Sequence, residues 1–279
     1  MTTPSTDQPR SAAPLTGIIG AGVMGETVLS GLLRAGRAAD SLLVVEKRPD
    51  RAAELEEKYA VRVVSHLHAV GDADTVMLVV KPQDMGAVLD EIAPVLRAGQ
   101  LLVSLAAGIT TGFIEGKVPA GVAVVRVMPN TPALVDEGMA AIAPGTSVDD
   151  AHLAEAEALL GAVGKVVRVP EHQMDAVTAV SGSGPAYVFY VVEAMIEAGV
   201  HLGLPRSVAS DLVIQTLVGS ATMLRETGTH PTVLREQVTS PAGTTAAALR
   251  ELDDHKVRAA FIAAMQAAAE RSRELAAGS

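Results

Sequence analysis

The chain has 279 residues, of which 49% are hydrophobic and 2% aromatic, and its formal net charge is −10. A chain this apolar can bury enough surface to offset the entropy of ordering, so general disorder is excluded. The acidic balance and the scarcity of aromatic residues argue against a nucleic-acid partner. Because the chain has no cysteine, disulfides, thiolate metal sites and cysteine nucleophiles are excluded. The length suits one large domain or two moderate ones.

The first fourteen residues are polar and contain three prolines. They lack the apolar core of a signal peptide, so we expect them to form a disordered tail. No uninterrupted apolar run of about 18 residues follows, so we expect neither a transmembrane helix nor a membrane partner. The absence of cysteine fits a reducing, cytoplasmic location.

Between residues 15 and 170, short apolar runs alternate with amphipathic stretches. The runs predict strands at 16–19, 42–46, 61–64, 75–80, 101–106, 122–127, 139–143 and 165–169. The stretches between them predict helices at 24–35, 49–59, 82–96, 110–116 and 151–162. Strands that are apolar on both faces and alternate with helices indicate an α/β fold with a parallel sheet covered by helices.

Beyond residue 170 the strand-like runs stop and alanine-rich helical stretches take over. We expect helices at about 172–180, 185–202, 205–227, 244–252 and 255–276. The chain is thus predicted to divide into domains at 15–170 and 171–279, the second all-helical. A small helical unit cannot cover runs as apolar as 188–192 and 212–214 by itself, so we infer a homodimer interface there. Packing within one chain is the alternative.

A G-x-G-x-x-G motif occupies residues 20–25, between the first predicted strand and the first predicted helix. In that context it predicts a dinucleotide site. Gly20 permits a tight turn, Gly22 lets the backbone approach a pyrophosphate, and Gly25 lets helix and strand pack closely. The start of the helix offers N–H groups to the phosphates. A glycine-rich turn without a ligand is the alternative.

The end of the second predicted strand carries conflicting signals for the coenzyme. Glu46 stands where an acidic residue would bind the ribose 2′-hydroxyl of NAD. Lys47 and Arg48 follow immediately and are suited to the 2′-phosphate of NADP. An ordinary charged strand end is the alternative, so coenzyme preference stays open.

The sequence lacks the residue patterns of metal sites, serine hydrolases and P-loops. The seven histidines form no H-E-x-x-H pair, so we expect no metal site. Ser183 lies in an S-G-S-G-P run, which misses the G-x-S-x-G pattern of serine hydrolases by one position. Residues 161–165 lack the spacing of a phosphate-binding P-loop.

Several segments together resemble the pyrroline-5-carboxylate reductase family. The most specific is Val-Thr-Ser-Pro-Ala-Gly-Thr-Thr at 238–245, which leads into a predicted helix. Further segments match the family in the right order from residue 16 onward, at 80–83, 106–109, 126–132, 175–187 and 203–206. The chain departs from the family at Ala242, where many members have glycine, and at His66, where members commonly have an asparagine that contacts the cofactor ribose.

The resemblance implies a Rossmann-type dinucleotide-binding domain followed by a helical dimerisation domain, with dimers often gathered into larger rings. It implies reduction of 1-pyrroline-5-carboxylate to L-proline, the last step of proline biosynthesis, with NADPH or, alternatively, NADH as cofactor. The residues that it assigns to the cofactor, together with the candidates named above, are Ile19, Gly20, Ala21, Gly22, Val23, Met24, Gly25, Lys47, Arg48, His66, Val80, Lys81, Pro82, Ala106, Ala107, Gly108 and Asn130.

The resemblance places the substrate carboxylate against Gly243, Thr244 and Thr245, contributed by the partner subunit. A Gly-Thr-Thr turn at a helix start also suits a small carboxylate on physical grounds, because it presents free N–H groups and hydroxyls. Plain helix capping by Thr244 is the structural alternative. A protonated imine is already electrophilic, so no strong side-chain acid is required, and Thr245 is the candidate catalytic residue as a hydrogen-bond partner of the ring nitrogen.

Two other functions fit a dinucleotide-binding domain followed by helices. One is a hydroxy-acid dehydrogenase, but such enzymes usually place a lysine in the helical domain as general acid or base, and no lysine occurs between residues 171 and 255. The other is a non-catalytic nucleotide-binding sensor, which would have no need of the carboxylate-binding turn.

Overall fold

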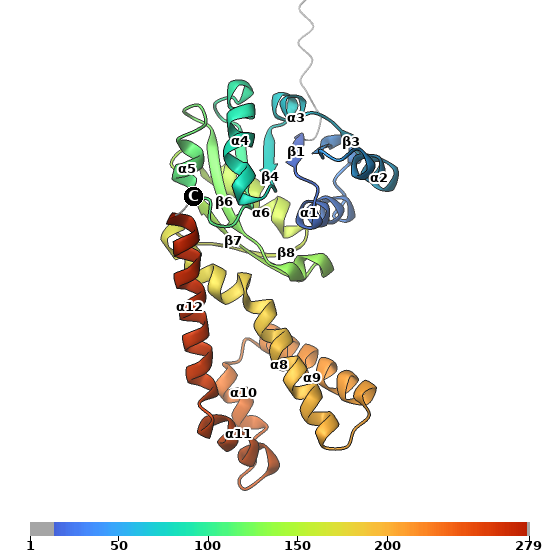
Figure 1. The fold of residues 1–279 in the computed structure, drawn as a ribbon, viewed down its shortest axis with the longest axis vertical. Coiled ribbons are helices and arrows are strands. Elements are labelled where there is room, and N and C mark those ends of the chain that lie inside the picture. Colours follow the sequence, from blue (N-terminus) through green and yellow to red (C-terminus); the bar gives the residue numbers. More distant parts are fainter. Residues whose placement is uncertain (1–13, 278–279) are drawn as a thin grey trace, which may run out of the picture. The chain divides into compact units, whose positions relative to one another are not determined.

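A computed structural model describes residues 14–277 (Figure 1). The chain divides into two compact units, a first unit of Met1–Gly182 with Arg271–Ser279 and a second unit of Ser183–Glu270. All but the last residue of the predicted N-terminal tail lies outside the described residues.

The first unit is built around one eight-stranded sheet in the order β3-β2-β1-β4-β5-β6-β7-β8. Its strands are β1 (Thr16–Ile19), β2 (Leu42–Val45), β3 (Arg62–Val63), β4 (Thr75–Leu78), β5 (Leu101–Ser104), β6 (Ala123–Met128), β7 (Gly138–Pro144) and β8 (Gly164–Arg168). The first six strands are parallel, with β1 between β2 and β4. Every residue of β1, β2, β4 and β5 is buried, as expected for strands covered on both faces.

The last two strands run opposite to the first six, whereas the alternation of strands and helices predicted a parallel sheet. β7 pairs antiparallel with β6, and β8 pairs parallel with β7. Only residues 129–137 connect β6 to β7. A parallel crossover needs about a dozen residues or more, usually including a helix, so this connection is short enough to favour an antiparallel return.

Helices cover both faces of the sheet (Figure 1). One face carries α1 (Val23–Arg34), α2 (Pro49–Tyr59) and α6 (Asp150–Gly161). The other carries α3 (His66–Asp72), α4 (Pro82–Ile92) and α5 (Thr111–Glu115). Of these helices only α3 was not predicted. It has seven residues, too few for a helical period to show, and it begins at Ser65, whose hydroxyl accepts the N–H of His68 at 3.3 Å.

The second unit is helical, as predicted. Its helices are α8 (Gly184–His201), α9 (Arg206–Thr227), α10 (Pro231–Gln237), α11 (Thr244–Asp254) and most of α12 (Val257–Ala277). The short α10 was not expected; Pro231 occupies its first turn and the ring of His230 accepts the N–H of Thr232 at 3.3 Å. Within the first unit, residues 171–182 form a 3₁₀ turn, the short α7 (Met174–Val177) and a π-helical turn.

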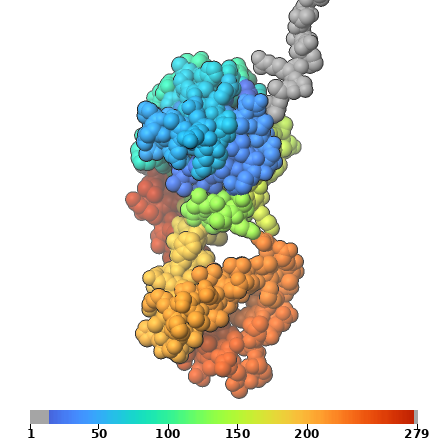
Figure 2. All heavy atoms as spheres, turned by 90° about the vertical axis from the view of Figure 1, so that its right-hand side faces the viewer, coloured from blue at the N-terminus to red at the C-terminus, as the bar shows by residue number. Residues whose placement is uncertain are grey.

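Helices α8 and α9 pack against each other (Figure 2). Large apolar side chains of both helices are open to solvent in the single chain. More than half of the surface of Phe189, Tyr190, Leu212 and Ile214 is exposed. By length and composition alone α9 could cross a membrane, which the sequence did not lead us to expect. That property does not establish a span, because helices covered by a partner subunit share it; an exposed apolar face of this kind marks an interaction surface.

Candidate functional site

A cleft of about 240 Å³, here called the glycine-turn cleft, opens beside the glycine-rich turn. It lies where β1, β2 and β4 end, at the edge where α/β sheets bind their ligands. Its lining residues come from those strand ends, from the glycine-rich turn before α1, from the start of α3 and from the first two turns of α4: Ile19, Gly20, Ala21, Gly22, Val45, Glu46, Lys47, His66, Val79, Val80, Lys81, Asp84 and Val88.

The three motif glycines differ in what surrounds them. Gly20 has φ 97°, and a Cβ there would collide with the carbonyl of Val79. A Cβ on Gly25 would collide with the carbonyl of Gly20, so α1 and the strand end can approach only at a glycine. A Cβ on Gly22 would meet no atom within 4 Å. Nothing in the fold therefore demands Gly22, which caps α1 with its backbone beside open space.

The charged end of β2 is organised by Glu46. Its carboxylate accepts the backbone N–H of Arg48 at 3.0 Å and lies 3.8 Å from the guanidinium of the same residue. The Glu46 side chain is 12% exposed and that of Arg48 is 66% exposed. Lys47 lines the cleft, whereas Arg48 is not among the lining residues. The carboxylate of Glu46 thus already has a cationic partner.

His66 enters the cleft from the start of α3. It is buried, with 8% of its surface exposed, and its Nδ1 lies 2.8 Å from Oε1 of Glu91 on α4. The Glu91 carboxylate itself is half exposed. Glu91 was not among the residues singled out from the sequence.

The remaining cofactor candidates of the first unit lie around the cleft or beyond it. Val80 and Lys81 line it, Pro82 begins α4, and Val23 and Met24 begin α1. The loop 106–108 follows β5 but does not line the cleft; Ala106 is buried and Gly108 has φ 77°.

Asn130 has a structural role in this arrangement. Its Nδ2 donates to the carbonyl of Ser181 at 3.1 Å, and its Oδ1 accepts the N–H of Met139 at 2.8 Å. Both ends of the amide are therefore engaged in joining the β6–β7 connection to β7 and to the π-helical turn.

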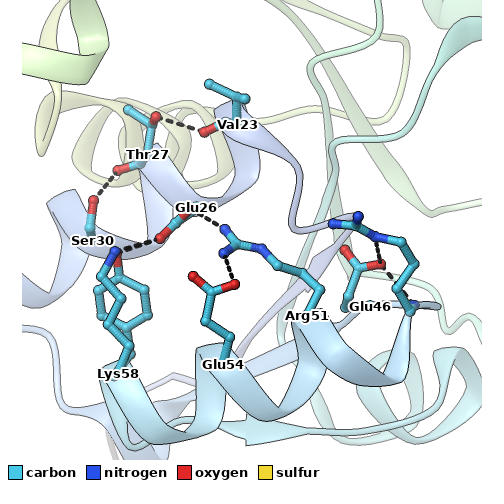
Figure 3. A network of polar contacts seen from close by, with 10 residues as sticks. Val23, Glu26, Thr27, Ser30, Glu46, Arg51, Glu54 and Lys58 are labelled. Carbon is cyan, nitrogen blue, oxygen red and sulfur yellow. Dashed lines mark hydrogen bonds and ion pairs between the residues drawn. The ribbon is translucent and has the colours of Figure 1, made fainter.

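A polar network ties the glycine-rich turn to α2 (Figure 3). Glu26, in the first turn of α1, accepts hydrogen bonds from Arg51 and, at 2.9 and 2.8 Å, from Lys58 and Tyr59. Partial burial alone would raise the pKa of Glu26, but the hydrogen bonds from Lys58, Tyr59 and Arg51 outweigh it and lower the pKa to about 2. The negative charge of Glu26 beside the glycine-rich turn is thus compensated by side chains of α2.

The predicted carboxylate-binding residues lie at the start of α11 in the second unit. Gly243 is the N-cap, and no side chain caps the helix, so capping by Thr244 does not explain the motif. A Cβ on Gly243 would collide with the hydroxyl of Ser240. Thr244 is exposed and Thr245 is half-buried. The first N–H groups of α11 are therefore free of side-chain caps.

Ala242 adopts φ 57°, in the left-handed region that favours glycine. Many members of the family that the sequence resembles have glycine at this position, and the structure shows that a positive φ is needed here. The turn before Gly243 therefore keeps the conformation of a glycine-containing turn with an alanine in it, at a conformational cost.

Comparison with known proteins decides the family. The family model "Pyrroline-5-carboxylate reductase dimerisation" matches residues 171–275, and "NADP oxidoreductase coenzyme F420-dependent" matches residues 16–108. The pyrroline-5-carboxylate reductase of Mycobacterium tuberculosis is 49% identical to this chain, over 92% of the chain and 95% of the relative. The chain belongs to the pyrroline-5-carboxylate reductase family. The enzyme of Corynebacterium melassecola is 46% identical, over 92% of this chain and 97% of the relative.

Solved structures of pyrroline-5-carboxylate reductases have the same fold. The enzyme of Coxiella burnetii superposes with a TM-score of 0.91 at 36% identity, covering 94% of this chain and 98% of its own. The enzyme of Plasmodium falciparum, solved with NADP bound, superposes with a TM-score of 0.84 at 30% identity and the same coverage. The predicted fold class, a Rossmann-type domain followed by a helical dimerisation domain, is confirmed.

The dimerisation match explains the exposed apolar helices. Residues 171–275 include all of α8 and α9, so the region that matches a dimerisation domain carries these open faces. This supports the predicted homodimer interface over packing within one chain.

Sequence analysis missed two acidic residues on α4. Asp84 lines the cleft and Glu91 binds His66. With Val88 they stand at helical positions i, i+4 and i+7, which places all three on one face of the helix. The spacing is visible in the sequence, but the sequence does not show that this face of α4 lies toward the cleft and His66.

Proposed function

We propose that the chain is an NAD(P)H-dependent oxidoreductase that reduces 1-pyrroline-5-carboxylate to L-proline, the last step of proline biosynthesis. The observation that carries the proposal is the glycine-turn cleft at the carboxyl edge of the sheet, on a chain that aligns with these reductases over 92% of its length.

The residues of the cleft fit a dinucleotide. Gly22 stands beside open space into which no atom of the fold protrudes, and α1 begins there without a side-chain cap. A pyrophosphate placed against it would meet backbone N–H groups and the positive end of the helix dipole. Residues 19–25, Lys47, His66, Val80 and Lys81 are proposed to hold the cofactor, with 106–108, Arg48, Pro82 and Asn130 as further candidates.

The end of β2 favours NADPH over NADH in this proposal. Glu46 would repel a 2′-phosphate if its charge were free, but Arg48 holds that carboxylate through a hydrogen bond and an ion pair. Lys47 lines the cleft and supplies positive charge. The NADP-bound relative from Plasmodium falciparum supports the same choice.

Substrate binding is assigned to the start of α11. The backbone N–H of Thr244 would hold the substrate carboxylate, and the hydroxyl of Thr245 would form a hydrogen bond with the ring nitrogen. The N–H of Gly243, expected to share in binding the carboxylate, instead donates to the carbonyl of Ser240 at 3.1 Å. When bound, the reduced nicotinamide supplies hydride to the carbon of the C=N bond. The protein orients the cofactor and the substrate and excludes water. Such positioning lowers the activation barrier by several kcal/mol, and by up to about 7–11 kcal/mol in well-oriented intramolecular reactions.

The proposed working assembly is at least a dimer, in which the partner subunit contributes the carboxylate-binding turn. A larger ring of dimers and a cytoplasmic location complete the proposal. We keep residue 170 as the proposed functional boundary between the dinucleotide-binding and dimerisation domains, although the compact units meet at residues 182 and 183. Sedimentation of the purified chain distinguishes a dimer from a larger ring of dimers.

A direct assay tests the function. Purified protein is mixed with 1-pyrroline-5-carboxylate and either NADPH or NADH, and the loss of reduced-nicotinamide absorbance is followed with proline identified as product. Oxidation with a higher kcat/KM for NADPH supports the proposal in full. A chain that binds the cofactor but never oxidises it would instead be the nucleotide sensor.

A further inference from the structure

The buried His66 and the half-exposed Glu91 form a hydrogen-bonded pair at the wall of the glycine-turn cleft. The imidazole lines the cleft and is almost fully buried, and its Nδ1 contacts Glu91 Oε1 at 2.8 Å. The proposed function uses His66 as a cofactor contact but leaves Glu91 without a role.

The arrangement of α4 explains how Glu91 reaches the ring. Asp84 and Val88 face the cleft from the first two turns of α4, and Glu91 lies one further turn along the same face. Helices α3 and α4 contact each other on this side of the sheet. The carboxylate therefore approaches His66 from the helix beside it, and Glu91 is not among the residues that line the cleft.

The partner of Nδ1 determines what the other ring nitrogen can do. A carboxylate only accepts hydrogen bonds, so Nδ1 must carry the hydrogen that it donates to Glu91. In a neutral imidazole that tautomer leaves Nε2 without a hydrogen, as an acceptor. A carboxylate that binds one nitrogen in this way also fixes the ring orientation, as it does for histidines that ligate metals.

We propose that Glu91 is a positioning residue for the cofactor: it holds His66 so that Nε2 accepts a hydrogen bond from a hydroxyl of the adenosine ribose. The adenosine half is assigned because His66 shares the cleft with Glu46 and Lys47, which follow β2 where a Rossmann sheet meets that ribose. The inference rests on the proposed function, since it requires that this cleft bind a nicotinamide dinucleotide. A ring already held in its binding orientation loses less entropy when the cofactor arrives.

A double-mutant cycle on cofactor binding tests the proposal. The dissociation constant of NADPH is measured by calorimetry for the wild-type chain, Glu91→Ala, His66→Asn and the double variant. Alanine suits a half-exposed helical position, so the fold is kept. We expect Glu91→Ala to raise Kd about threefold to tenfold, the size of one hydrogen bond, in the wild-type background and to have no effect in the His66→Asn background.

Asp90→Ala is the matched control. Asp90 precedes Glu91 on α4 and forms a 2.8 Å ion pair with Lys117 on the surface, away from the cleft lining. Its removal should leave Kd unchanged. Nitrogen-15 NMR of the histidine side chains provides a second readout: the signal lost in His66→Asn should report a hydrogen on Nδ1 in the wild type, and Glu91→Ala should redistribute it between the two nitrogens.

The outcomes separate the two proposals. If the wild-type chain binds neither NADPH nor NADH, the proposed function fails and the role of Glu91 fails with it. If the wild type binds NADPH but Glu91→Ala does not change Kd, or changes it equally in the His66→Asn background, only the positioning role is overturned. A hydrogen on Nε2 of His66 in the wild type would also overturn it.

Discussion

Arg51 on α2 pairs with Glu26 in the first turn of α1, so one ion pair connects the helix that follows the glycine-rich turn to the helix that follows Glu46–Arg48 (Figure 3). Lys58 and Tyr59 bind the same carboxylate from the end of α2. The two segments that border the cleft are therefore linked through a single acidic side chain. Several charge-assisted hydrogen bonds to one partly buried group are stronger than an exposed ion pair.

The first prediction concerns the stability that Glu26 provides. Glu26→Gln should lower the free energy of unfolding at neutral pH by about 1–3 kcal/mol, because three donors lose their charged acceptor. Glu54→Gln is the control: Glu54 pairs with the same Arg51 at 2.6 Å but its side chain is 55% exposed, so a loss of less than about 1 kcal/mol is expected. Urea unfolding measures both. Equal losses in the two variants would contradict the special role of Glu26.

The second prediction is the pH dependence of that stability. The pKa of Glu26 is lowered from 4.5 to about 2 in the folded chain, so the folded state favours the carboxylate form. The stability that this provides is present above pH 4.5 and is lost as the pH falls through the folded pKa near 2. The difference between the wild type and Glu26→Gln should therefore be constant near neutral pH and shrink between pH 4.5 and 2. A difference that stays constant down to pH 2 would show that the charge is not responsible.

The third prediction separates binding from folding within the glycine motif. Gly22→Ala should leave the melting temperature unchanged, because its Cβ would meet no atom within 4 Å. It should nevertheless raise the Kd of NADPH by about tenfold or more, or about 1.4 kcal/mol, because the methyl group occupies the space of the pyrophosphate. Gly25→Ala should lose about 1–3 kcal/mol of stability, since its Cβ would collide with the Gly20 carbonyl. Calorimetry and thermal unfolding measure the two effects, and a destabilised Gly22→Ala chain would contradict the assignment.

The fourth prediction concerns the strained alanine before the carboxylate-binding turn. Left-handed backbone costs an L-residue about 1–2 kcal/mol, and glycine costs about 0.4–1 kcal/mol more in unfolded-chain entropy. Ala242→Gly, at φ 57°, should therefore leave the stability unchanged or raise it by up to about 1.6 kcal/mol. Ala248→Gly, an exposed interior position of α11, is the control and should lose about 0.5–1 kcal/mol. Thermal unfolding gives the sign of the stability change in each variant. A clear loss of stability in Ala242→Gly would show that Ala242 is not strained.

These particular residues also show what the sequence can predict. The turn at 20–25 was predictable because glycine roles follow from spacing and from the strand and helix on either side. The partner of His66 was not, because a contact across two helices depends on how α3 and α4 pack. The alanine at 242 does not itself indicate a positive φ, although the glycine of many family members at this position is consistent with one. The direction of β7 was in principle available from its short connection, but periodicity alone does not encode strand direction.

The fifth prediction tests the proposed chemistry at α11. Thr245→Ala should lower kcat about tenfold to hundredfold, the effect of losing one hydrogen bond of about 1.5–3 kcal/mol to a group whose charge changes during the reaction. The Kd of NADPH should not change, because no role in cofactor binding is assigned to Thr245. Thr245→Ser keeps the hydroxyl and should retain most of the activity. Thr244→Ala should also remain active, because that residue is proposed to act through its backbone N–H. Unchanged turnover in Thr245→Ala would remove its hydroxyl from the mechanism and leave the backbone N–H groups as the contribution of this turn.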